Sequence, residues 1–338
     1  MCNNKKNIEI KLKHQTLNGN IMLKNRKEMV KIFIKTRCES KELQILKYLD
    51  VRESLPDEKK QHFLNLKKGF EGEKLFDKWL QNYLSDGLIL CDLLFEVNQT
   101  LFQIDTLLLK GSKIYLFEVK NFEGDFYLAK DRWYTIYDKE INDPLMQLER
   151  SKSLFRQLLY SLGYHDTIEA YLVFVNPEFT LYQSRLNAPI IYPNQLNKFL
   201  KKLNDNSTKQ SSTHLQLIKQ LLPLHLEDSP YTRIPPYNFQ KIKKGIICKS
   251  CFTLVEHVCT YRVVCKNCGY IERLETAVLR QIEEYKLLFP EKEISTNSIS
   301  EWCKIIKNKR AIRAILMENF TPVGYGRGLH YVEKMDVE

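Results

Sequence analysis

Two alternating runs, residues 102–109 and 113–119, flank a Gly111–Ser112 pair and constrain the fold more than any other stretch of the chain. Such a pair between alternating runs indicates a two-residue β-hairpin. With Gly111 and Ser112 in the loop, Lys110 faces Lys113, and every later pair of facing residues is then fixed. Because side chains alternate between the two sides of a strand, this register also decides which residues share one face.

The register places Asp105 opposite Glu118 and Gln103 opposite Lys120, with all four side chains on one side of the hairpin. Directly opposed β-carbons lie about 4.5–5.5 Å apart. Two carboxylates at this distance repel each other unless a cation lies between them, and such oxygen ligands suit Mg²⁺ or Mn²⁺. Lys120 then lies within reach of the ion's water or of a substrate phosphate. The hairpin therefore predicts a divalent-metal site.

A surface hairpin in which Lys120 forms salt bridges with the two acids is the alternative interpretation. The strand pattern argues against it, because apolar side chains line both sides of 113–119: Tyr115, Phe117 and Val119 on one, Ile114 and Leu116 on the other. A strand that is apolar on both sides is typical of a sheet buried on both faces. Charged residues at the end of such a strand require a reason.

The composition indicates a folded protein with material for two or three modules, because 43% of its 338 residues are hydrophobic and 28% are charged. No run of 18 apolar residues is present, and the Lys-rich amino terminus lacks the apolar segment of a secretory signal. We therefore expect a cytoplasmic protein without membrane contact. The excess of 52 − 41 = 11 positive charges favours a polyanionic partner, with a merely soluble basic protein as the alternative.

The expected order of elements is helix, three strands, helix, strand, which is an α/β (α+β) fold. The first helix starts near Gly69 and Gly72 and places Glu73 on its apolar face, where the carboxylate is either paired or half-solvated by the first turn. Asp143–Pro144 starts the second helix, which ends at Gly163. The expected segments are an arm and helical lead-in (1–59), a catalytic domain (60–200), a linker with a short helix (201–240), a ribbon (241–275) and a helical region (276–338).

Several short motifs in this order resemble the nuclease-related domain family, NERD, of the PD-(D/E)xK or restriction-endonuclease-like superfamily. They are Gly69-Phe70-Glu71-Gly72-Glu73, Gln103-Ile104-Asp105, Phe117-Glu118-Val119-Lys120-Asn121, Gly124 and Asp143-Pro144 followed by Gln147. The resemblance covers roughly residues 60 to 180 and implies an αβββαβ core. Asp143 stands where the family usually has asparagine, a departure that leaves the site residues intact.

The resemblance implies metal-dependent hydrolysis of phosphodiester bonds with Mg²⁺ or Mn²⁺. Asp105 and Glu118 would bind the ion, with the Val119 carbonyl as a third ligand, and Lys120 would position the attacking water. The remaining implied site residues are Glu73 as an accessory carboxylate, and Gln103 and Gln147 as polar supports. The hairpin register gives the placement of Asp105, Glu118 and Lys120 independently.

Cysteines in a chain without a secretion signal favour thiols or metal ligands over a disulfide framework. Two Cys-x-x-Cys pairs match the spacing of a zinc ribbon, with a strand-like stretch from Phe252 to Val264 between them. The four predicted ligands of a structural zinc ion are Cys248, Cys251, Cys265 and Cys268. His257 and Cys259 are alternative ligands, and a redox dithiol is the alternative chemistry.

The carboxy-terminal region predicts three helices, 276–289, 298–306 and 309–318, of which the last two resemble a helix-turn-helix. Lys309, Arg310 and Arg313 lie near the start of the last helix, and Arg327 lies in a glycine-rich loop behind it. We expect these four residues to contact nucleic acid, with a solvated helix face as the alternative. The basic ribbon has two interpretations also, contact with nucleic acid or a small interaction module.

The sequence as a whole predicts a metal-dependent nuclease that acts on nucleic acid, DNA rather than RNA. A catalytically inactive nucleic-acid-binding or regulatory protein on a nuclease fold is the first alternative, although Asp105, Glu118 and Lys120 are all present. A zinc-ribbon adaptor that binds other proteins is the second, and the net positive charge disfavours it.

Overall fold

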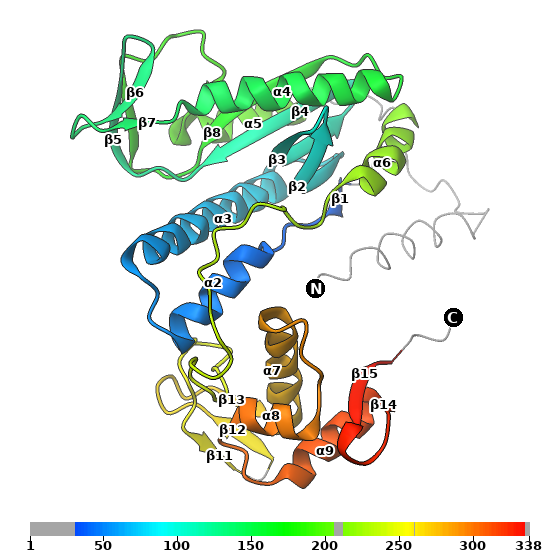
Figure 1. The fold of residues 1–338 in the computed structure, drawn as a ribbon. Helices are drawn as coiled ribbons and strands as arrows, with labels where there is room; N and C mark the ends of the chain where they lie inside the picture. The colour runs from blue at the N-terminus through cyan, green and yellow to red at the C-terminus, as the bar shows by residue number, and fades with distance from the viewer. Residues whose placement is uncertain (1–30, 206–211, 260, 335–338) are drawn as a thin grey trace. The chain divides into compact units, whose positions relative to one another are not determined.

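The computed structural model describes residues 31–205, 212–259 and 261–334 (Figure 1). The described residues form two compact units. Unit 1 comprises the described part of Met1–Glu39 with Asn65–Pro230, and unit 2 comprises Ser40–Leu64 with Tyr231–Glu338. Both units mix helices and strands, so the expected α/β (α+β) class is confirmed.

Unit 1 is built on a six-stranded sheet with the order β1-β2-β3-β4-β8-β10. Its strands are β1 Lys31–Lys35, β2 Gly87–Val97, β3 Thr100–Lys110, β4 Lys113–Lys120, β8 Ile168–Phe174 and β10 Ile190–Ile191. Strands β2, β3 and β4 form an antiparallel meander, while β1 and β8 pair in parallel with β2 and β4. The expected order of helix, three strands, helix and strand is confirmed.

The hairpin β3–β4 has the predicted register, because Lys110 pairs with Lys113 and the ladder continues to Thr106 and Phe117. Asp105 and Glu118 follow at the next position on each strand. Here the Asp105 carboxylate accepts a hydrogen bond from the Val119 backbone N–H, with 2.8 Å between Oδ2 and N. The acid thus takes a backbone donor of the neighbouring strand.

Helices cover both faces of this sheet, which confirms that it is buried on both sides. The helices are α3 Asp57–Tyr83, α4 Pro144–Ser161, α5 Leu196–Asp205 and α6 Ser212–Leu224, with a short 3-10 turn η1 Pro193–Gln195. Buried residues of α3 and α5 pack with Phe117 in one core cluster, and those of α4 and α6 pack with Leu116 in another. Figure 1 shows α3 and α4 on opposite faces of the strands.

Helix α3 is much longer than predicted, and Gly69 and Gly72 lie inside it rather than at its start. A glycine inside a helix is about 1 kcal/mol less favourable than alanine, so a pair of glycines favours a helix boundary over a helix interior. Gly72 has a packing reason, because a Cβ there would lie 2.4 Å from Cβ of Asn121. The Asn121 amide also donates to the Lys68 carbonyl at 2.8 Å. The segment after β4 therefore lies directly against the helix backbone.

A second, four-stranded sheet with the order β7-β6-β5-β9 was not predicted. Its strands are β5 Gly124–Ala129, β6 Arg132–Thr135, β7 Glu140–Ile141 and β9 Phe179–Tyr182. The β5–β6 turn has Lys130 and Asp131 at φ 49° and 60°. Such turns usually carry Asn-Gly or Asp-Gly, which tolerate positive φ, so the usual signal is missing here.

The stretch 201–240, expected as a linker with a short helix, contributes to the core of unit 1. Leu217, Ile218 and Leu221 of α6 are buried in the cluster that contains α4. The polar residues around the helix favoured a linker, but the apolar face of α6 covers the sheet.

Unit 2 joins an early helix to the carboxy-terminal half of the chain. Its helices are α2 Lys41–Arg52, α7 Leu274–Leu288, α8 Thr296–Cys303 and α9 Lys309–Asn319. Its strands are β11 His257–Val258, β12 Arg262–Val264 and β13 Ile271–Arg273, and a hairpin of β14 Phe320–Val323 and β15 His330–Glu333 with the 3-10 turn η2 Gly326–Gly328 between them. The ribbon strands are shorter than the predicted stretch from Phe252 to Val264.

The close approach of Asn121 to Gly72 can be tested by substitution, with Gly69 of the same helix as the matched control. Gly72→Ala should lower the free energy of unfolding by about 1–3 kcal/mol, because the new methyl group displaces Asn121. Gly69→Ala in the same helix meets nothing within 4 Å and should raise it by about 0.5–1 kcal/mol. Urea denaturation of the full chain measures both values, and equal effects of the two substitutions would contradict the packing argument.

Candidate functional site

The ends of β3 and β4 bring together Asp105, Glu118 and Lys120. Glu118 is only 1% exposed, and Asp105 is also buried. Lys120 Nζ donates to Glu118 Oε1 at 2.7 Å and to Gln147 Oε1 on the first turn of α4 at 3.0 Å. The side chains that the hairpin pattern selected therefore meet at one place, and Gln147 joins them.

The acids at this site are held in a strongly perturbed electrostatic state. Burial, together with the nearby charge of Asp105, raises the pKa of Glu118 to about 8. Burial alone would lower the pKa of Lys120, but the carboxylates of Glu118 and Asp105 raise it, so the ammonium stays charged at neutral pH. The site combines an easily protonated carboxyl with a fixed cation.

Glu73 of α3 lies close enough to Asp105 to feel its charge. Burial and then the Asp105 charge raise the pKa of Glu73 to about 8, while Arg37 opposes the shift. The Arg37 guanidinium binds the Glu73 carboxylate with Nη1 at 2.7 Å from Oε2. The sequence left open whether Glu73 is paired or half-solvated. In the structure it is paired, and its partner Arg37 lies just after β1.

Arg37 is the site residue that sequence reasoning missed. Its side chain is 2% exposed and also binds Asp77 of α3 through Nε at 2.9 Å and Asp92 of β2. It donates further to the Asp105 carbonyl at 2.9 Å and to Thr106 Oγ1 at 3.0 Å. No motif in the sequence connects Arg37 with these acids, and only the parallel pairing of β1 with β2 brings Arg37 here.

Gln103 does not join this cluster. It is exposed on β3 and pairs with Leu94 of β2, and the contacts described for the structured residues give it no partner among the acids. The hairpin ladder ends before reaching it, so its predicted position opposite Lys120 has no β-pairing to support it.

A cavity of about 430 Å³ adjoins the site. Lys120 and Gln147 form one side of it, and its remaining lining residues are Phe122, Phe126, Thr135, Ile141, Asn142 and Pro144. These residues come from the end of β4, the second sheet and the start of α4. The unpredicted sheet therefore forms a wall beside the charged residues.

Glu118 provides the structural test of whether a divalent cation fits. Its Oε2 is buried and has no hydrogen-bond partner, while Oε1 binds Lys120. An unpaired buried carboxylate oxygen next to a second buried carboxylate is unfavourable without a cation. The donor set fits Mg²⁺ or Mn²⁺. Within the described part of the chain, no three carboxylates come as close together as the cysteines do, so the acids would supply two ligands rather than a complete cage.

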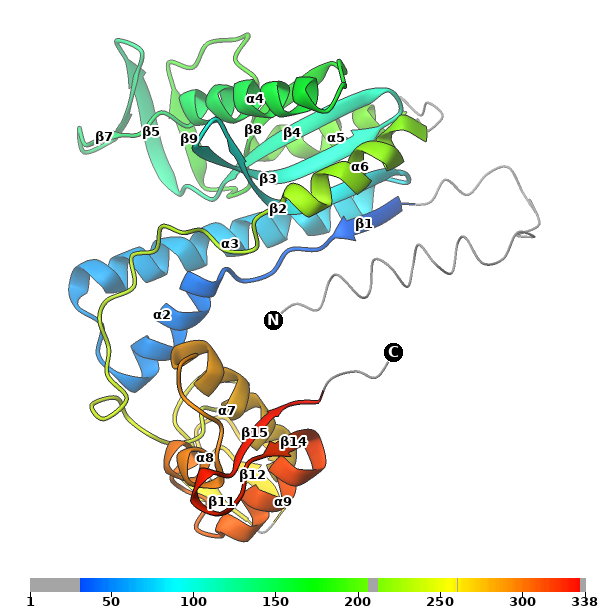
Figure 2. The same ribbon diagram turned by 45° about the vertical axis from the view of Figure 1, so that its right-hand side comes forward.

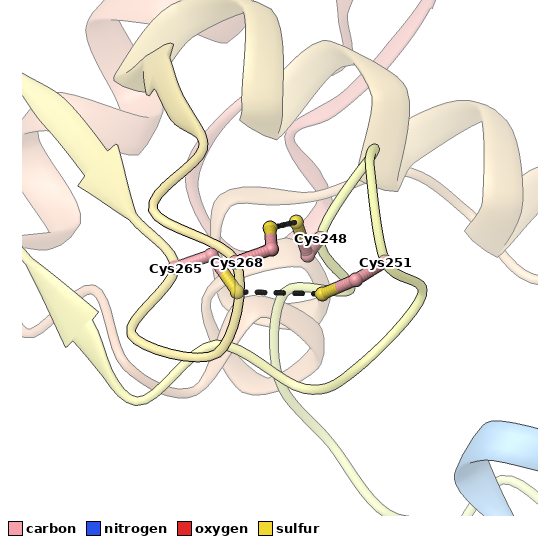
Figure 3. A group of neighbouring side chains, drawn as sticks. All are labelled: Cys248, Cys251, Cys265 and Cys268. Atoms are coloured by element: carbon pink, nitrogen blue, oxygen red, sulfur yellow. Dashed lines mark hydrogen bonds between the residues drawn. The ribbon is translucent and has the colours of Figure 1, made fainter.

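The four predicted cysteines of unit 2 form a compact cluster (Figure 3). Their sulfur atoms lie within 4.8 Å of one another, with 3.7 Å between Cys248 and Cys268 and 3.5 Å between Cys251 and Cys265. A tetrahedral ion with metal–sulfur distances of about 2.3 Å requires sulfur separations near 3.8 Å. The cluster is therefore compatible with a zinc ribbon, and Cys259 lies outside it.

The backbone forms a tight turn around each of the two cysteine pairs. Phe252 N–H donates to the Cys248 carbonyl at 3.1 Å, and Gly269 N–H donates to the Cys265 carbonyl at 2.9 Å. Phe252 has φ 57°, an unfavourable value for an aromatic residue, and its ring contacts Lys47 of α2. The contact with α2 helps explain why a residue other than glycine occupies this turn.

Thr253 is a support for the cluster that the spacing of cysteines did not reveal. Its hydroxyl lies 3.1 Å from the sulfur of Cys251 and 3.8 Å from that of Cys265. A hydroxyl in this position can donate to a thiolate and so stabilise a deprotonated ligand. All four cysteines being engaged leaves no open coordination position, as in structural rather than catalytic zinc sites.

The residues predicted to contact nucleic acid lie in the carboxy-terminal part of unit 2. Lys309, Arg310 and Arg313 are exposed on α9, whose start is capped by the side chain of Asn308. Arg327 lies in η2, and its side chain falls outside the described part of the structure.

Comparison with known protein families identifies one segment of the chain. Residues 68–175 match the family model of the nuclease-related domain, NERD. The chain contains a nuclease-related domain. No curated protein and no solved structure matches the chain. The matched segment of the NERD domain includes Glu73, Asp105, Glu118, Lys120 and Gln147, whereas Arg37 lies outside it. None of the described helices has the length and apolar character needed to cross a membrane.

The raised pKa values of Glu73 and Glu118 predict how stability changes with pH. Both carboxyls keep their protons in the native protein up to about pH 8, whereas the unfolded chain releases them near 4.5. The contribution of these two carboxyls to the free energy of unfolding is therefore complete below pH 4.5 and is lost as the pH rises toward 8. Urea unfolding of the full chain without Mg²⁺ should show this loss, and Glu118→Gln should reduce it. A pH dependence that Glu118→Gln leaves unchanged would contradict the assignment.

The cysteine cluster predicts one zinc ion per chain. Elemental analysis of the purified protein should find it, and Cys248→Ser/Cys265→Ser should lose it and unfold the ribbon. Cys259→Ser is the matched control, because this exposed cysteine lies outside the cluster and should leave the zinc content unchanged. Absence of zinc from the native protein would refute the ribbon.

Proposed function

We propose that the nuclease-related domain is a metal-dependent nuclease that hydrolyses phosphodiester bonds in DNA. The observation that carries the proposal is the pair of buried carboxylates, Asp105 and Glu118, with one unpaired oxygen on Glu118 and the Lys120 ammonium beside it. Within a nuclease-related domain, this charge pattern suits a divalent cation and an anionic phosphate.

The catalytic roles follow from the chemistry of these side chains. Asp105 and Glu118, with the Val119 carbonyl, would hold Mg²⁺ or Mn²⁺, which when bound lowers the pKa of water and adds positive charge at the phosphate. Lys120 would orient the attacking water and contact a non-bridging oxygen of the phosphate as the negative charge grows.

Neighbouring side chains would hold this arrangement in place. Gln147 accepts from Lys120 and so limits the positions that the ammonium can take. Asp105 is fixed by the Val119 N–H. Glu73, which is held by Arg37, would be an accessory carboxylate. For Gln103 we propose at most contact with substrate, because it is exposed.

Two other functions compete with hydrolysis. An inactive nucleic-acid-binding protein would have no need for buried acids whose pKa values are raised to about 8, since removing them would stabilise the fold. A zinc-ribbon adaptor for protein partners accounts for the cysteines but not for this site. We place further contacts with nucleic acid on the basic ribbon and the carboxy-terminal region.

Hydrolysis can be tested with variants at the two ends of one strand. Lys120→Ala, at the end of β4, should reduce cleavage by about 10²-fold or more, because it removes charge stabilisation of the transition state. Lys113→Ala, at the start of β4, breaks only an exposed ion pair with Glu169 and should cleave like the wild type. Asp105→Ala and Glu118→Ala should abolish cleavage.

The assay uses single-stranded, duplex, branched and modified DNA, and RNA, with Mg²⁺ or Mn²⁺. Circular dichroism checks that each variant remains folded. Wild-type protein that cuts none of these substrates would remove the support for a nuclease, and cleavage of RNA alone would overturn the choice of DNA.

A further inference from the structure

The carboxy-terminal part of unit 2 has the element order of a winged helix-turn-helix. Helix α7 is followed by an extended residue, Ile294, which pairs with Tyr331 of β15. Helices α8 and α9 come next, and the hairpin β14–β15 closes the order. The hairpin thus pairs back to the segment between the first and second helices, a contact that a bare helix-turn-helix lacks.

A single apolar core holds these elements together. Trp302 of α8 and Ile312 and Leu316 of α9 are fully buried, and Tyr331 brings the hairpin into the same region. Helix α9 contacts α7, α8 and both strands of the hairpin. Figure 2 shows the hairpin beside the end of α9. The orientation of α9 is therefore fixed, so one side of it is permanently turned outward.

That outward side carries a pattern suited to a nucleic-acid groove. Arg310, Arg313, Ala314 and Met317 are all exposed and follow the i, i+3, i+4, i+7 spacing of one helix face. Among the described residues, neither Arg310 nor Arg313 forms an ion pair, and Met317 is 48% exposed. An exposed stripe of free cations with small and apolar side chains can contact phosphates and thymine methyl groups.

The surrounding charge favours a polyanion. From Glu301 to Arg313 the chain has five basic residues and one acidic residue. Lys309 at the start of α9 binds Asn297 Oδ1 of α8 at 3.0 Å, whereas the exposed Arg310 and Arg313 have no such partner among the described residues. Phosphate neutralisation is the usual source of affinity for DNA.

The hairpin tip has the geometry for close approach to a backbone. Gly324 has φ 77°, and a Cβ there would lie 2.6 Å from the Gly328 carbonyl oxygen, so the tip requires glycine. Tyr325 at this tip is 92% exposed. A tight tip that presents an exposed aromatic ring to solvent has no role in the core of this unit.

We propose that α9 enters the major groove of duplex DNA through Arg310, Arg313, Ala314 and Met317, with the β14–β15 tip against the adjacent backbone. An α-helix with side chains is about 10–12 Å wide, which matches the groove width of about 12 Å. This rests on the nucleic-acid contact in the proposed function and names its ligand and contact surface. Hydrolysis is not required for it.

Binding can be measured apart from cleavage. The full, zinc-containing chain with Lys120→Ala is titrated against a fluorescein-labelled random-sequence duplex by fluorescence anisotropy at several salt concentrations. Adding Arg310→Ala/Arg313→Ala should weaken binding about tenfold or more and lower the slope of log affinity against log salt by roughly 2. Met317→Glu, which removes no buried group, should weaken binding by placing a negative charge on the same face.

Lys201→Ala/Lys202→Ala is the matched control for net charge. These exposed lysines lie near the end of α5. Asn204 of the same helix end binds Ser85, which lies just before β2. The start of β2 and Lys120 are at opposite ends of the sheet. The two lysine substitutions should leave duplex affinity unchanged. Unchanged affinity in the arginine variant, or an equal loss in the lysine control, would overturn the proposal. Tighter binding to single-stranded DNA than to duplex would also overturn it. Binding of polyglutamate as tightly as duplex would overturn it too and would indicate an acidic protein partner.

Discussion

The ion pairs of the buried Arg37 guanidinium are the interactions on which the packing of unit 1 around its acidic residues depends. The guanidinium binds carboxylates from two different elements, Glu73 and Asp77 of α3 and Asp92 of β2. Three carboxylates so close together would repel one another and resist burial without a shared cation. Arginine suits this role because its planar group offers five donors in fixed directions. Helix α3 can therefore pack its acidic residues against the sheet only because β1 delivers Arg37.

Within the described residues, Arg37 does not form an ion pair with the neighbouring carboxylates of Asp105 and Glu118. Arg37 serves the outer carboxylates, and only the carbonyl of Asp105 reaches it. Asp105 and Glu118 share the single ammonium of Lys120, and burial with mutual repulsion raises the pKa of Glu118 to about 8. The fold thus provides a cation for one side of the acid cluster, whereas on the other side Asp105 and Glu118 cannot both ionise at neutral pH without a further cation. A divalent cation would supply that charge, which links the packing of α3 to the proposed chemistry.

The parts of the site that the sequence predicts are those fixed by local geometry. A two-residue turn sets the hairpin register, so Asp105, Glu118 and Lys120 could be placed together without a structure. Arg37 could not, because it lies 36 residues before Glu73 and no local pattern connects them. The second sheet was missed since Lys130 and Asp131 form its tight turn without glycine. Gly72 suggests the wrong start for helix α3, because the glycine is required by a tertiary contact with Asn121 that no local pattern reveals.

Unit 2 repeats this dependence on an early arginine. Arg52 at the end of α2 is completely buried, binds Glu284 of α7 at 2.5 Å and lies over the Trp302 ring at 3.8 Å. It also donates to the Lys243 and Gly245 carbonyls just before the first cysteine pair. In each unit, a buried arginine from the early part of the chain, Arg37 or Arg52, therefore joins elements that are distant in the sequence. Both arginines lie before the family match, which begins at residue 68. The match marks the nuclease-related segment, while the physical unit that holds its acids in place also needs Arg37.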